Sequence, residues 1–334
     1  MTTDAAEMTT TSSRSTASAP GGDKTFKVRI RAMTWEASGV ISLQLTAADG
    51  GALPSFEPGA HIDLTLPNGA LRQYSLCGDP SDTSQYRLGV RAIDGGASSG
   101  FIHRQLRPGD LVTVSTPRNN FPFVDAARYV FVAGGIGITP LIAMMRAASA
   151  GNRPWTLFYC NRRNEDAPFL AEIEALGGEI SLHASEAGTR LDIKQRLATA
   201  RKDTIVYCCG PERLMTAVEE ATAPWPEGSV RFEWFTPRQR PDGETSGGFD
   251  VVCQASGLTV TVPPDKSILA ALTESGIDLP SSCEQGICGT CEVRVISGDV
   301  DHRDSILSSG ERAANQSMMI CVSRARCSRL VLDV

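Results

Sequence analysis

The sequence lacks the features that mark membrane and nucleic-acid proteins. No apolar run reaches the about 18 residues that a membrane-spanning helix needs. Its 32 Lys and Arg residues are outnumbered by 38 Asp and Glu residues, giving a net charge of −6, whereas nucleic-acid binders usually present a basic face. We find no serine triad, HExxH helix, Walker loop or paired-carboxylate motif, which argues against hydrolysis and phosphoryl transfer. We expect no membrane or nucleic-acid partner.

The start of the chain also lacks a targeting signal. Residues 1–24, MTTDAAEMTTTSSRSTASAPGGDK, have no apolar core of a secretory signal, and their acidic residues make a poor transit peptide. We expect a disordered leader here. Without an export signal, the ten cysteines of the chain are expected to stay reduced and to serve metal binding or redox chemistry. These features predict a cytoplasmic protein.

The length of 334 residues favours two or three domains, and composition divides the chain accordingly. Residues 25–123 hold six short apolar-polar runs separated by turns, which predicts an antiparallel β-barrel or sandwich. Residues 124–236 alternate strand and helix patterns, which predicts a parallel sheet wrapped by helices. Residues 237–248, rich in glycine, proline and charge, are expected to form a linker to a third domain, residues 249–334.

The third domain carries the most specific motif, CEQGICGTC. Its spacing C-x4-C-x2-C, with a further cysteine 30 residues on, is the plant-type pattern of a 2Fe-2S cluster. Each iron needs two thiolates beside the bridging sulfides, so four ligands are predicted. Gly286 and Gly289 permit a tight loop whose backbone N–H groups point at sulfur. The predicted ligands are Cys283, Cys288, Cys291 and Cys321.

Two alternatives bear on this assignment. A structural zinc site would more naturally pair two C-x2-C knuckles. Cys327 lies only six residues after Cys321, but outside the spacing, so we interpret it as a core or surface thiol. The residues 249–334 resemble a plant-type ferredoxin domain, and this resemblance implies an α+β β-grasp fold.

A one-electron cluster needs a flavin between it and a two-electron nicotinamide. The stretch RQYSL resembles the R-x-Y-S motif of the ferredoxin-NADP reductase superfamily. The resemblance implies that Arg72 meets the flavin phosphate and that Tyr74, with Gln73 beside it in the motif, packs against the isoalloxazine. It also implies that Ser75 hydrogen-bonds near flavin N5, the atom that receives hydride, and so acts in catalysis.

Three further segments accompany this motif. Gly96, Ser98 and Ser99 in GGASSGFIH open a predicted helix, whose N–H groups favour a phosphate, although a plain glycine turn with a serine cap is the alternative. PRNNF resembles the segment that ends the flavin domain in the phthalate dioxygenase reductase group. Phe235, in RFEWF, occupies the family position of an aromatic that lies against the flavin.

The second domain is expected to hold the nucleotide. AGGIGITP follows a buried strand and opens a helix, where Thr139 is placed to cap and Pro140 suits the first turn. Pro140 stands where the G-x-G-x-x-G fingerprint has its third glycine. The segment instead resembles the G-G-x-G-x-T-P loop of the same superfamily, which implies that pyrophosphate lies over Gly134, Gly135 and Gly137.

The turn CGP and the segment NRRNED complete the nucleotide prediction. The family places Cys209 of the Cys209-Gly210-Pro211 turn beside the nicotinamide ring, which makes it a second candidate catalytic residue. A buried strand end is the alternative for this cysteine. NRRNED, residues 161–166, sits where the adenosine ribose would lie; its two arginines could accept a 2′-phosphate, but the group that the chain resembles uses NADH.

The domain order resembles that of the phthalate dioxygenase reductase and vanillate O-demethylase oxidoreductase family. This resemblance implies an NADH-dependent iron–sulfur flavoprotein, expected to be a monomer. Electrons would pass from NADH through FMN and the 2Fe-2S cluster to a separate Rieske-type terminal oxygenase, an aromatic-ring dioxygenase or an O-demethylase. FMN is expected rather than FAD because RQYSLCGDP and PRNNF resemble the FMN group.

Two other functions stay open at this point. An FAD-containing NAD(P)H reductase could serve another monooxygenase or a hybrid-cluster protein. A non-enzymatic 2Fe-2S electron carrier or redox sensor would have degenerate nucleotide domains. The joint presence of RQYSL, GGIGITP and CGP argues against the second.

Overall fold

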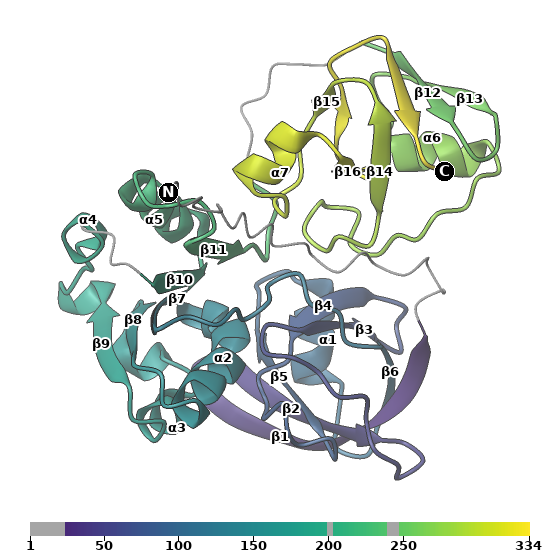
Figure 1. The fold of residues 1–334 in the computed structure, drawn as a ribbon. Coiled ribbons are helices and arrows are strands. Elements are labelled where there is room, and N and C mark those ends of the chain that lie inside the picture. Colours follow the sequence, from purple (N-terminus) through teal and green to yellow (C-terminus); the bar gives the residue numbers. More distant parts are fainter. Residues whose placement is uncertain (1–23, 199–202, 239–246) are drawn as a thin grey trace, which may run out of the picture.

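The computed structural model describes residues 24–198, 203–238 and 247–334. The predicted leader therefore lies outside the described residues except for Lys24, and so does most of the predicted linker. Three sheets of different architecture follow one another along the chain (Figure 1). None of the helices in the described part combines the length and apolar character that a membrane crossing requires.

The first sheet is antiparallel, in the order β4-β3-β6-β1-β2-β5, and we name it with its helix the barrel module. Leu76, just after β4, pairs with Leu88 of β5, so the two ends of the order meet and the sheet closes. The predicted barrel is confirmed, with a core of alternating Leu, Ile and Val side chains. Its elements are β1 (Thr25–Ala37), β2 (Val40–Ala47), β3 (His61–Thr65), β4 (Leu71–Ser75), β5 (Tyr86–Arg91), α1 (Ala97–Arg104) and β6 (Leu111–Ser115).

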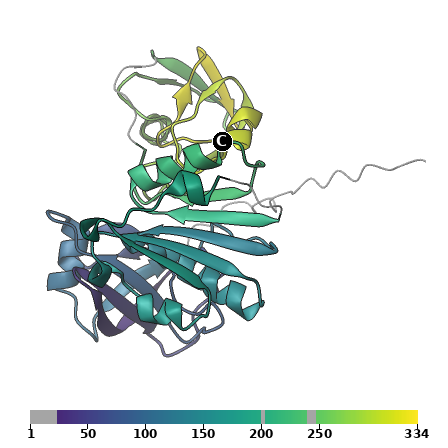
Figure 2. The same ribbon diagram turned by 90° about the vertical axis from the view of Figure 1, so that its left-hand side faces the viewer.

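The second sheet is parallel, in the order β11-β10-β7-β8-β9, and helices flank it as predicted. We name it the parallel-sheet module (Figure 2). The sequence indicated the three central strands; the two edge strands, β9 and β11, are mostly half-buried and lack a continuous apolar run. Its elements are β7 (Arg128–Gly134), η1 (Gly135–Ile138), α2 (Thr139–Ala150), β8 (Trp155–Asn161), η2 (Asn164–Asp166), α3 (Leu170–Glu174), β9 (Glu179–Ala184), η3 (Ser185–Ala187), α4 (Ile193–Arg196), β10 (Thr204–Cys209), α5 (Glu212–Thr222) and β11 (Val230–Glu233).

The last module is a mixed sheet, β13-β12-β18-β14-β16, with a helix packed on it and a separate strand pair, β15-β17. We name it the carboxy-terminal module. Strand and helix side chains share one core, as an α+β fold requires. Its elements are β12 (Phe249–Cys253), β13 (Thr259–Val262), α6 (Ile268–Glu274), β14 (Glu292–Ser297), β15 (Val300–Asp301), α7 (Ser309–Ala314), β16 (Ser317–Met319), β17 (Arg324–Ala325) and β18 (Arg329–Leu332).

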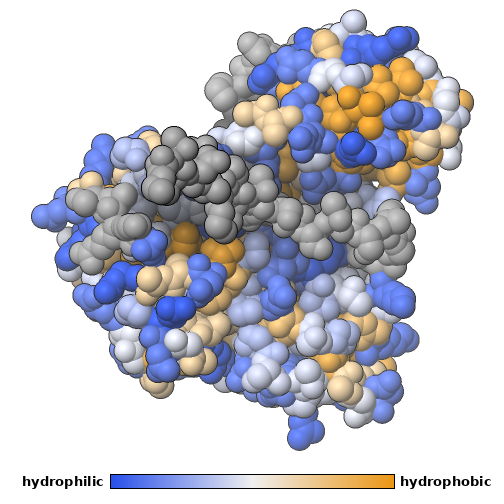
Figure 3. Space-filling view, in the orientation of Figure 1, coloured by the Kyte–Doolittle hydropathy of each residue, from blue (hydrophilic) through white to orange (hydrophobic). Residues whose placement is uncertain are grey.

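The barrel and parallel-sheet modules pack closely together. Arg87 of β5 and Arg146 of α2 both bind the carboxylate of Glu172 in α3, at 2.6 and 2.5 Å. Gly89 of β5 permits this approach, because a Cβ there would lie 2.6 Å from Thr139 Cγ2. The carboxy-terminal module forms a separate lobe above them (Figure 3). The three modules meet at one place, where the polar side chains described below converge.

Candidate functional site

A cavity of about 430 Å³, the central cavity, lies where the three modules meet. The segments that the sequence predicted for flavin binding all border it, although they come from distant parts of the chain. From the carboxy-terminal module, Cys283 and Ile306 contribute to its wall. The predicted residues that line it are Arg72, Gln73, Tyr74, Ser75, Gly96, Ser98, Ser99, Thr139 and Phe235.

Two polar atoms in the wall of this cavity have no partner among the described residues. They are Nε2 of His61, on β3, and Oγ of Ser98, on α1. Burial lowers the pKa of His61 to about 4, so its imidazole is neutral and can donate or accept one hydrogen bond. Buried polar groups are normally hydrogen-bonded, so these two atoms fit a polar ligand in the cavity. The sequence analysis missed His61.

Ser75 is paired with an acid that the sequence analysis also missed. Its hydroxyl donates to Oε2 of Glu233, the last residue of β11, at 3.3 Å. Burial raises the pKa of Glu233 to about 8, so the carboxyl holds its proton at neutral pH. The only signal in the sequence was its position two residues before Phe235. The cavity therefore holds a protonated carboxyl beside the serine predicted to act in catalysis.

Cys209 lies at the end of β10 and is completely buried. Burial, followed by the nearby Glu233 carboxyl, raises the pKa of its thiol well above the ordinary value. It does not line either of the two cavities described here, whereas Pro211, two residues on, does line the second. The CGP turn thus borders the outer cavity through Pro211, and its thiol is buried in the protein.

The second cavity, the outer cavity, has a volume of about 940 Å³ and lies over the parallel-sheet module. Arg91 and Ile136 line both cavities, so the two adjoin at this point. Neither side-chain atom of Asn161 that can hydrogen-bond has a partner among the described residues. Because Asn161 is buried and borders the outer cavity, its amide is available to a ligand there.

Charged pairs surround the far end of the outer cavity. Arg162 binds Glu186 at 2.6 Å, and Arg163 forms two hydrogen bonds to Asp166, at 3.0 and 2.9 Å. All four side chains border the cavity. The two arginines of NRRNED are therefore each matched by an acid.

The glycines of AGGIGITP have two roles: some permit close packing against the CGP turn, and one borders the outer cavity. A Cβ on Gly137 would lie 2.3 Å from the carbonyl oxygen of Cys209, and one on Gly134 would lie 2.4 Å from Pro211, so both permit packing against the CGP turn. Gly135 instead has a φ of 53° and borders the outer cavity, where a Cβ would lie 3.9 Å from Nη1 of Arg91.

The expectation that Thr139 caps the helix is wrong. A 3-10 turn, η1, precedes α2, so the N-cap position falls on Ile138. Thr139 lies inside the helix, and its hydroxyl donates to the carbonyl of Ile136 at 3.0 Å. Pro140 does occupy the first turn, as predicted.

The cysteine loop, residues 281–291, and Cys321 bring four thiols together as two pairs. The Cys283 thiol interacts with that of Cys288, and the Cys291 thiol with that of Cys321. The described residues include no group of three or more His, Cys, Asp or Glu side chains placed to hold a single metal ion. Two pairs of thiols fit a two-iron cluster, in which each iron takes two cysteines, better than they fit one zinc ion.

The backbone of the cysteine loop is turned toward sulfur. The N–H of Gln285 donates to Sγ of Cys283 at 3.3 Å. Gly286 and Gly289 have φ values of 69° and 73°, which glycine adopts without strain. Cys327 lies elsewhere: its Sγ accepts from the backbone N–H of Asp299 at 3.3 Å and approaches the carbonyl of Arg329.

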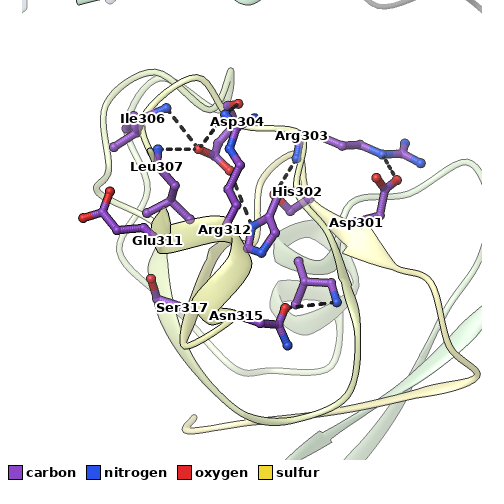
Figure 4. Close-up of polar contacts among 12 residues, drawn as sticks. Asp301, His302, Arg303, Asp304, Ile306, Leu307, Glu311, Arg312, Asn315 and Ser317 are labelled. Atoms are coloured by element: carbon purple, nitrogen blue, oxygen red, sulfur yellow. Dashed lines mark hydrogen bonds and ion pairs between the residues drawn. The ribbon is translucent and has the colours of Figure 1, made fainter. Parts of the chain in front are cut away.

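A buried carboxylate organises the segment behind the cysteine loop (Figure 4). Oδ2 of Asp304 accepts from the backbone N–H groups of Ile306 and Leu307, at 3.0 and 2.8 Å. Arg312 of α7 reaches over and donates to the carbonyl of Asp304 at 2.6 Å. The next amide, of Ser305, donates to the carbonyl of Gly286 in the cysteine loop at 2.9 Å. Asp304 thus fixes the wall of the central cavity that adjoins the cysteines.

Three known domain families match consecutive parts of the chain. The oxidoreductase FAD-binding domain matches residues 35–123, and the oxidoreductase NAD-binding domain matches residues 131–220. The 2Fe-2S iron-sulfur cluster binding domain matches residues 251–326. The order of the three domains agrees with the order of the three sheets.

Whole proteins match over nearly the full chain. The phthalate 4,5-dioxygenase oxygenase reductase subunit of Pseudomonas putida is 41% identical over 317 residues, which cover 92% of this chain and 96% of that protein. The phthalate dioxygenase reductase of Burkholderia cepacia is 36% identical and is covered over 99% of its length. A solved structure of phthalate dioxygenase reductase matches with a TM-score of 0.67 at 35% identity, over 93% of this chain and 98% of that one.

One further structure is similar in a different context. An intact type IV self-sufficient cytochrome P-450 monooxygenase matches with a TM-score of 0.86 at 39% identity; the match covers 93% of this chain but only 41% of that protein. The resemblance stated from the motifs is confirmed by the long matches. The chain is an oxidoreductase with flavin, NAD and 2Fe-2S domains, and it belongs to the phthalate dioxygenase reductase family.

Proposed function

We propose that this protein is the NADH-dependent reductase component of a two-component Rieske oxygenase. NADH binds in the outer cavity and the flavin in the central cavity. Electrons leave through the cysteine loop to the terminal oxygenase. The observation that carries the proposal is continuity: Arg91 and Ile136 join the outer cavity to the central one, and Cys283 lines the central cavity. When bound, the flavin and the cluster convert the two electrons of a hydride into single electrons.

The flavin-binding roles assigned from the sequence are proposed for the residues of the central cavity. Arg72, with the hydroxyls of Ser98 and Ser99, holds the flavin phosphate; Tyr74 and Phe235 flank the ring. Ser75 directs its hydroxyl at the position that receives hydride. The unpartnered Oγ of Ser98 supports this assignment, because a phosphate oxygen would satisfy it.

The dinucleotide roles are proposed for the two segments between the cavities. The glycine loop carries the pyrophosphate, with Gly135 as the glycine that faces it, and the CGP turn supports the nicotinamide end. Because the Cys209 thiol is buried, its proposed contribution is to shape the site. The residues assigned to this binding are Gly134, Gly135, Gly137, Thr139, Pro140, Cys209, Gly210 and Pro211.

The flavin proposed is FMN. The support is the likeness of RQYSLCGDP and PRNNF to the FMN group, together with the walls that three modules place around a cavity of about 430 Å³. FAD carries an additional adenosine monophosphate, which would have to extend beyond these walls. Heat extraction of the flavin from the purified protein, followed by chromatography, is expected to give FMN. Recovery of FAD in equal amount to the protein would overturn this part of the proposal.

NADH is proposed over NADPH because of the acids at the far end of the outer cavity. Glu186 and Asp166 already pair with Arg162 and Arg163, the two arginines of NRRNED. At these two arginines a dianionic phosphate would have to displace a carboxylate, whereas a ribose hydroxyl can hydrogen-bond to one.

The proposed partner is a Rieske-type terminal oxygenase acting on an aromatic acid or aryl ether. The relatives include reductase subunits named for phthalate 4,5-dioxygenase and for toluene-4-sulfonate monooxygenase, and one named for carnitine monooxygenase. Further parts of the proposal are a monomeric state, a cytoplasmic location, and a division into domains at residues 25–123, 124–236 and 249–334 with a linker at 237–248.

The test is turnover with a purified Rieske oxygenase of the phthalate type under NADH. The proposal expects product formation that depends on this protein, with NADPH a poor donor. Reduction of the flavin by NADH without any oxygenase turnover would instead favour the second candidate, a reductase for a monooxygenase of another type. The match to part of a self-sufficient cytochrome P-450 monooxygenase is the observation that favours this second candidate.

A further inference from the structure

A buried carboxylate in the barrel reaches the cysteine loop directly. Asp63 lies on β3 and is only 6% exposed. Its Oδ1 accepts from Nη2 of Arg118 at 2.7 Å and from Nε2 of Gln73 at 3.1 Å. Its Oδ2 accepts from the hydroxyl of Ser282 at 2.8 Å, across 219 residues of chain. Ser282 immediately precedes Cys283, so the bond ends beside a predicted cluster ligand.

The carboxylate is ionised and therefore a strong acceptor. Its burial would raise its pKa, but the hydrogen bond and charge of Arg118, with the bonds from Ser282 and Gln73, outweigh this and hold the pKa of Asp63 below its usual value. Hydrogen bonds to a charged acceptor are stronger than neutral ones and depend closely on direction. The Ser282 hydroxyl is thus fixed in one position against the barrel.

A second bond crosses the same boundary from another element. Nδ2 of Asn120, in the PRNNF segment, donates to the carbonyl of Cys288 at 2.5 Å. The next residue, Gly289, makes room for it, because a Cβ there would lie 2.9 Å from Nδ2 of Asn120. The two bonds hold the cysteine loop beside both cysteines of its first thiol pair.

We propose that Asp63 and Asn120 form a latch that holds the cysteine loop against the barrel module. Ser282 is the positioning residue, because its hydroxyl donates to Asp63. The latch sets the gap between the central cavity and the cluster, and so controls the rate of electron transfer between them. This inference rests on the proposed function. It concerns the residues that position the cysteine loop, and it assigns them no part in the reduction of the flavin by NADH.

The test compares serine variants in the full-length, cofactor-loaded protein. Ser282→Ala removes the bond to Asp63 and the longer bond, 3.5 Å, that Nε2 of Gln73 donates to the same hydroxyl. It leaves the buried Asp63–Arg118 pair, which Asp63→Ala would disrupt. Ser282→Thr keeps the hydroxyl. Ser281→Ala is the matched control, since this neighbour lies in the same loop and is exposed. Anaerobic stopped-flow absorbance follows flavin reduction by NADH and cluster reduction separately, and hydrogen exchange follows the amides of residues 281–291.

Loss of a bond to a charged acceptor is expected to slow cluster reduction about tenfold in Ser282→Ala, while flavin reduction stays within about twofold of the wild type. Exchange in the cysteine loop should rise in the same variant. Ser282→Thr and Ser281→Ala should match the wild type in both measurements.

Three results would overturn the latch. They are wild-type cluster reduction and exchange in Ser282→Ala, an equal defect in Ser282→Thr, and an equal slowing of flavin and cluster reduction. A wild-type protein that NADH does not reduce would instead refute the proposed function, and the exchange measurement would still decide the latch. The two failures are therefore distinguishable.

Discussion

The central and outer cavities differ in enclosure and in the groups that line them. The central cavity, about 430 Å³, has walls from three modules and presents the unpartnered Nε2 of His61 and Oγ of Ser98. The outer cavity, about 940 Å³, also borders one buried unpartnered side chain, that of Asn161, but it is lined by exposed ion pairs such as Arg162–Glu186, whose side chains are 79% and 47% exposed. Exposed pairs rearrange at little cost, whereas buried polar atoms require a fixed partner. The difference suits a retained flavin beside an exchanging dinucleotide.

Removing the carboxy-terminal module, which forms one wall of the central cavity, is expected to have the largest effect on oxygenase turnover. A chain cut near Gly243, residues 25–242, should still reduce ferricyanide with NADH but should give no oxygenase turnover, because only the cluster passes electrons to the oxygenase. Added at high concentration, residues 247–334 should restore part of the turnover, since the linker mainly supplies effective concentration. The measurement is NADH-driven oxygenase product formation. Full turnover without the carboxy-terminal module would show that the flavin feeds the oxygenase directly.

A smaller change tests the chemistry between the cavities. Ser75→Ala removes a hydroxyl whose hydrogen bond contributes on the order of 1 kcal/mol in the ground state and more as charge develops. We expect stopped-flow flavin reduction to slow by more than about tenfold, with little change in nucleotide affinity. The exposed Ser55→Ala is the control. An unchanged reduction rate in Ser75→Ala would remove this serine from the reaction.

The unpartnered Nε2 of His61 allows a test of flavin binding in the central cavity. His61→Leu should weaken flavin binding to the apoprotein about tenfold, because about one hydrogen bond to a buried neutral group is lost. Fluorescence titration measures it. His183→Leu, which changes a residue of the outer cavity, should leave flavin affinity unchanged. Equal affinities for His61→Leu and wild type would mean that Nε2 does not meet the flavin.

The smallest effect is expected at the rim of the outer cavity. Glu186→Gln should narrow the preference for NADH over NADPH by about fivefold, because an exposed charge contributes little. The ratio of kcat/KM values for the two nucleotides measures it, and the exposed Glu174→Gln serves as control. If Glu186→Gln preferred NADH as strongly as the wild type does, another group would have to determine the choice between NADH and NADPH.

The cysteine loop and the R-x-Y-S strand could be predicted because each is a short, local pattern. Three of the four predicted ligands lie within nine residues, and the glycines between them have the positive φ that such a loop needs. Alternating apolar residues likewise predicted the barrel strands, and continuous apolar runs predicted the buried strands of the parallel sheet.

The rest depended on residues that meet only after folding. Glu233 reaches Ser75 from an edge strand 158 residues away, and Asp63 reaches Ser282 across 219 residues. No local pattern marks either pair. The prediction that Thr139 caps the helix was wrong because the 3-10 turn before α2 moves the helix start by one residue. A shift of this size lies within the uncertainty of any boundary predicted from sequence.

The central claim is that the flavin of the central cavity is reduced from the outer cavity and passes electrons to the terminal oxygenase only through the cysteine loop. Anaerobic stopped-flow mixing of Cys288→Ser with NADH tests it most directly. The account predicts flavin bleaching at the wild-type rate, no 2Fe-2S absorption and no reduction of the terminal oxygenase. A normal cluster and normal delivery in Cys288→Ser, with both lost in Cys327→Ser, would contradict it.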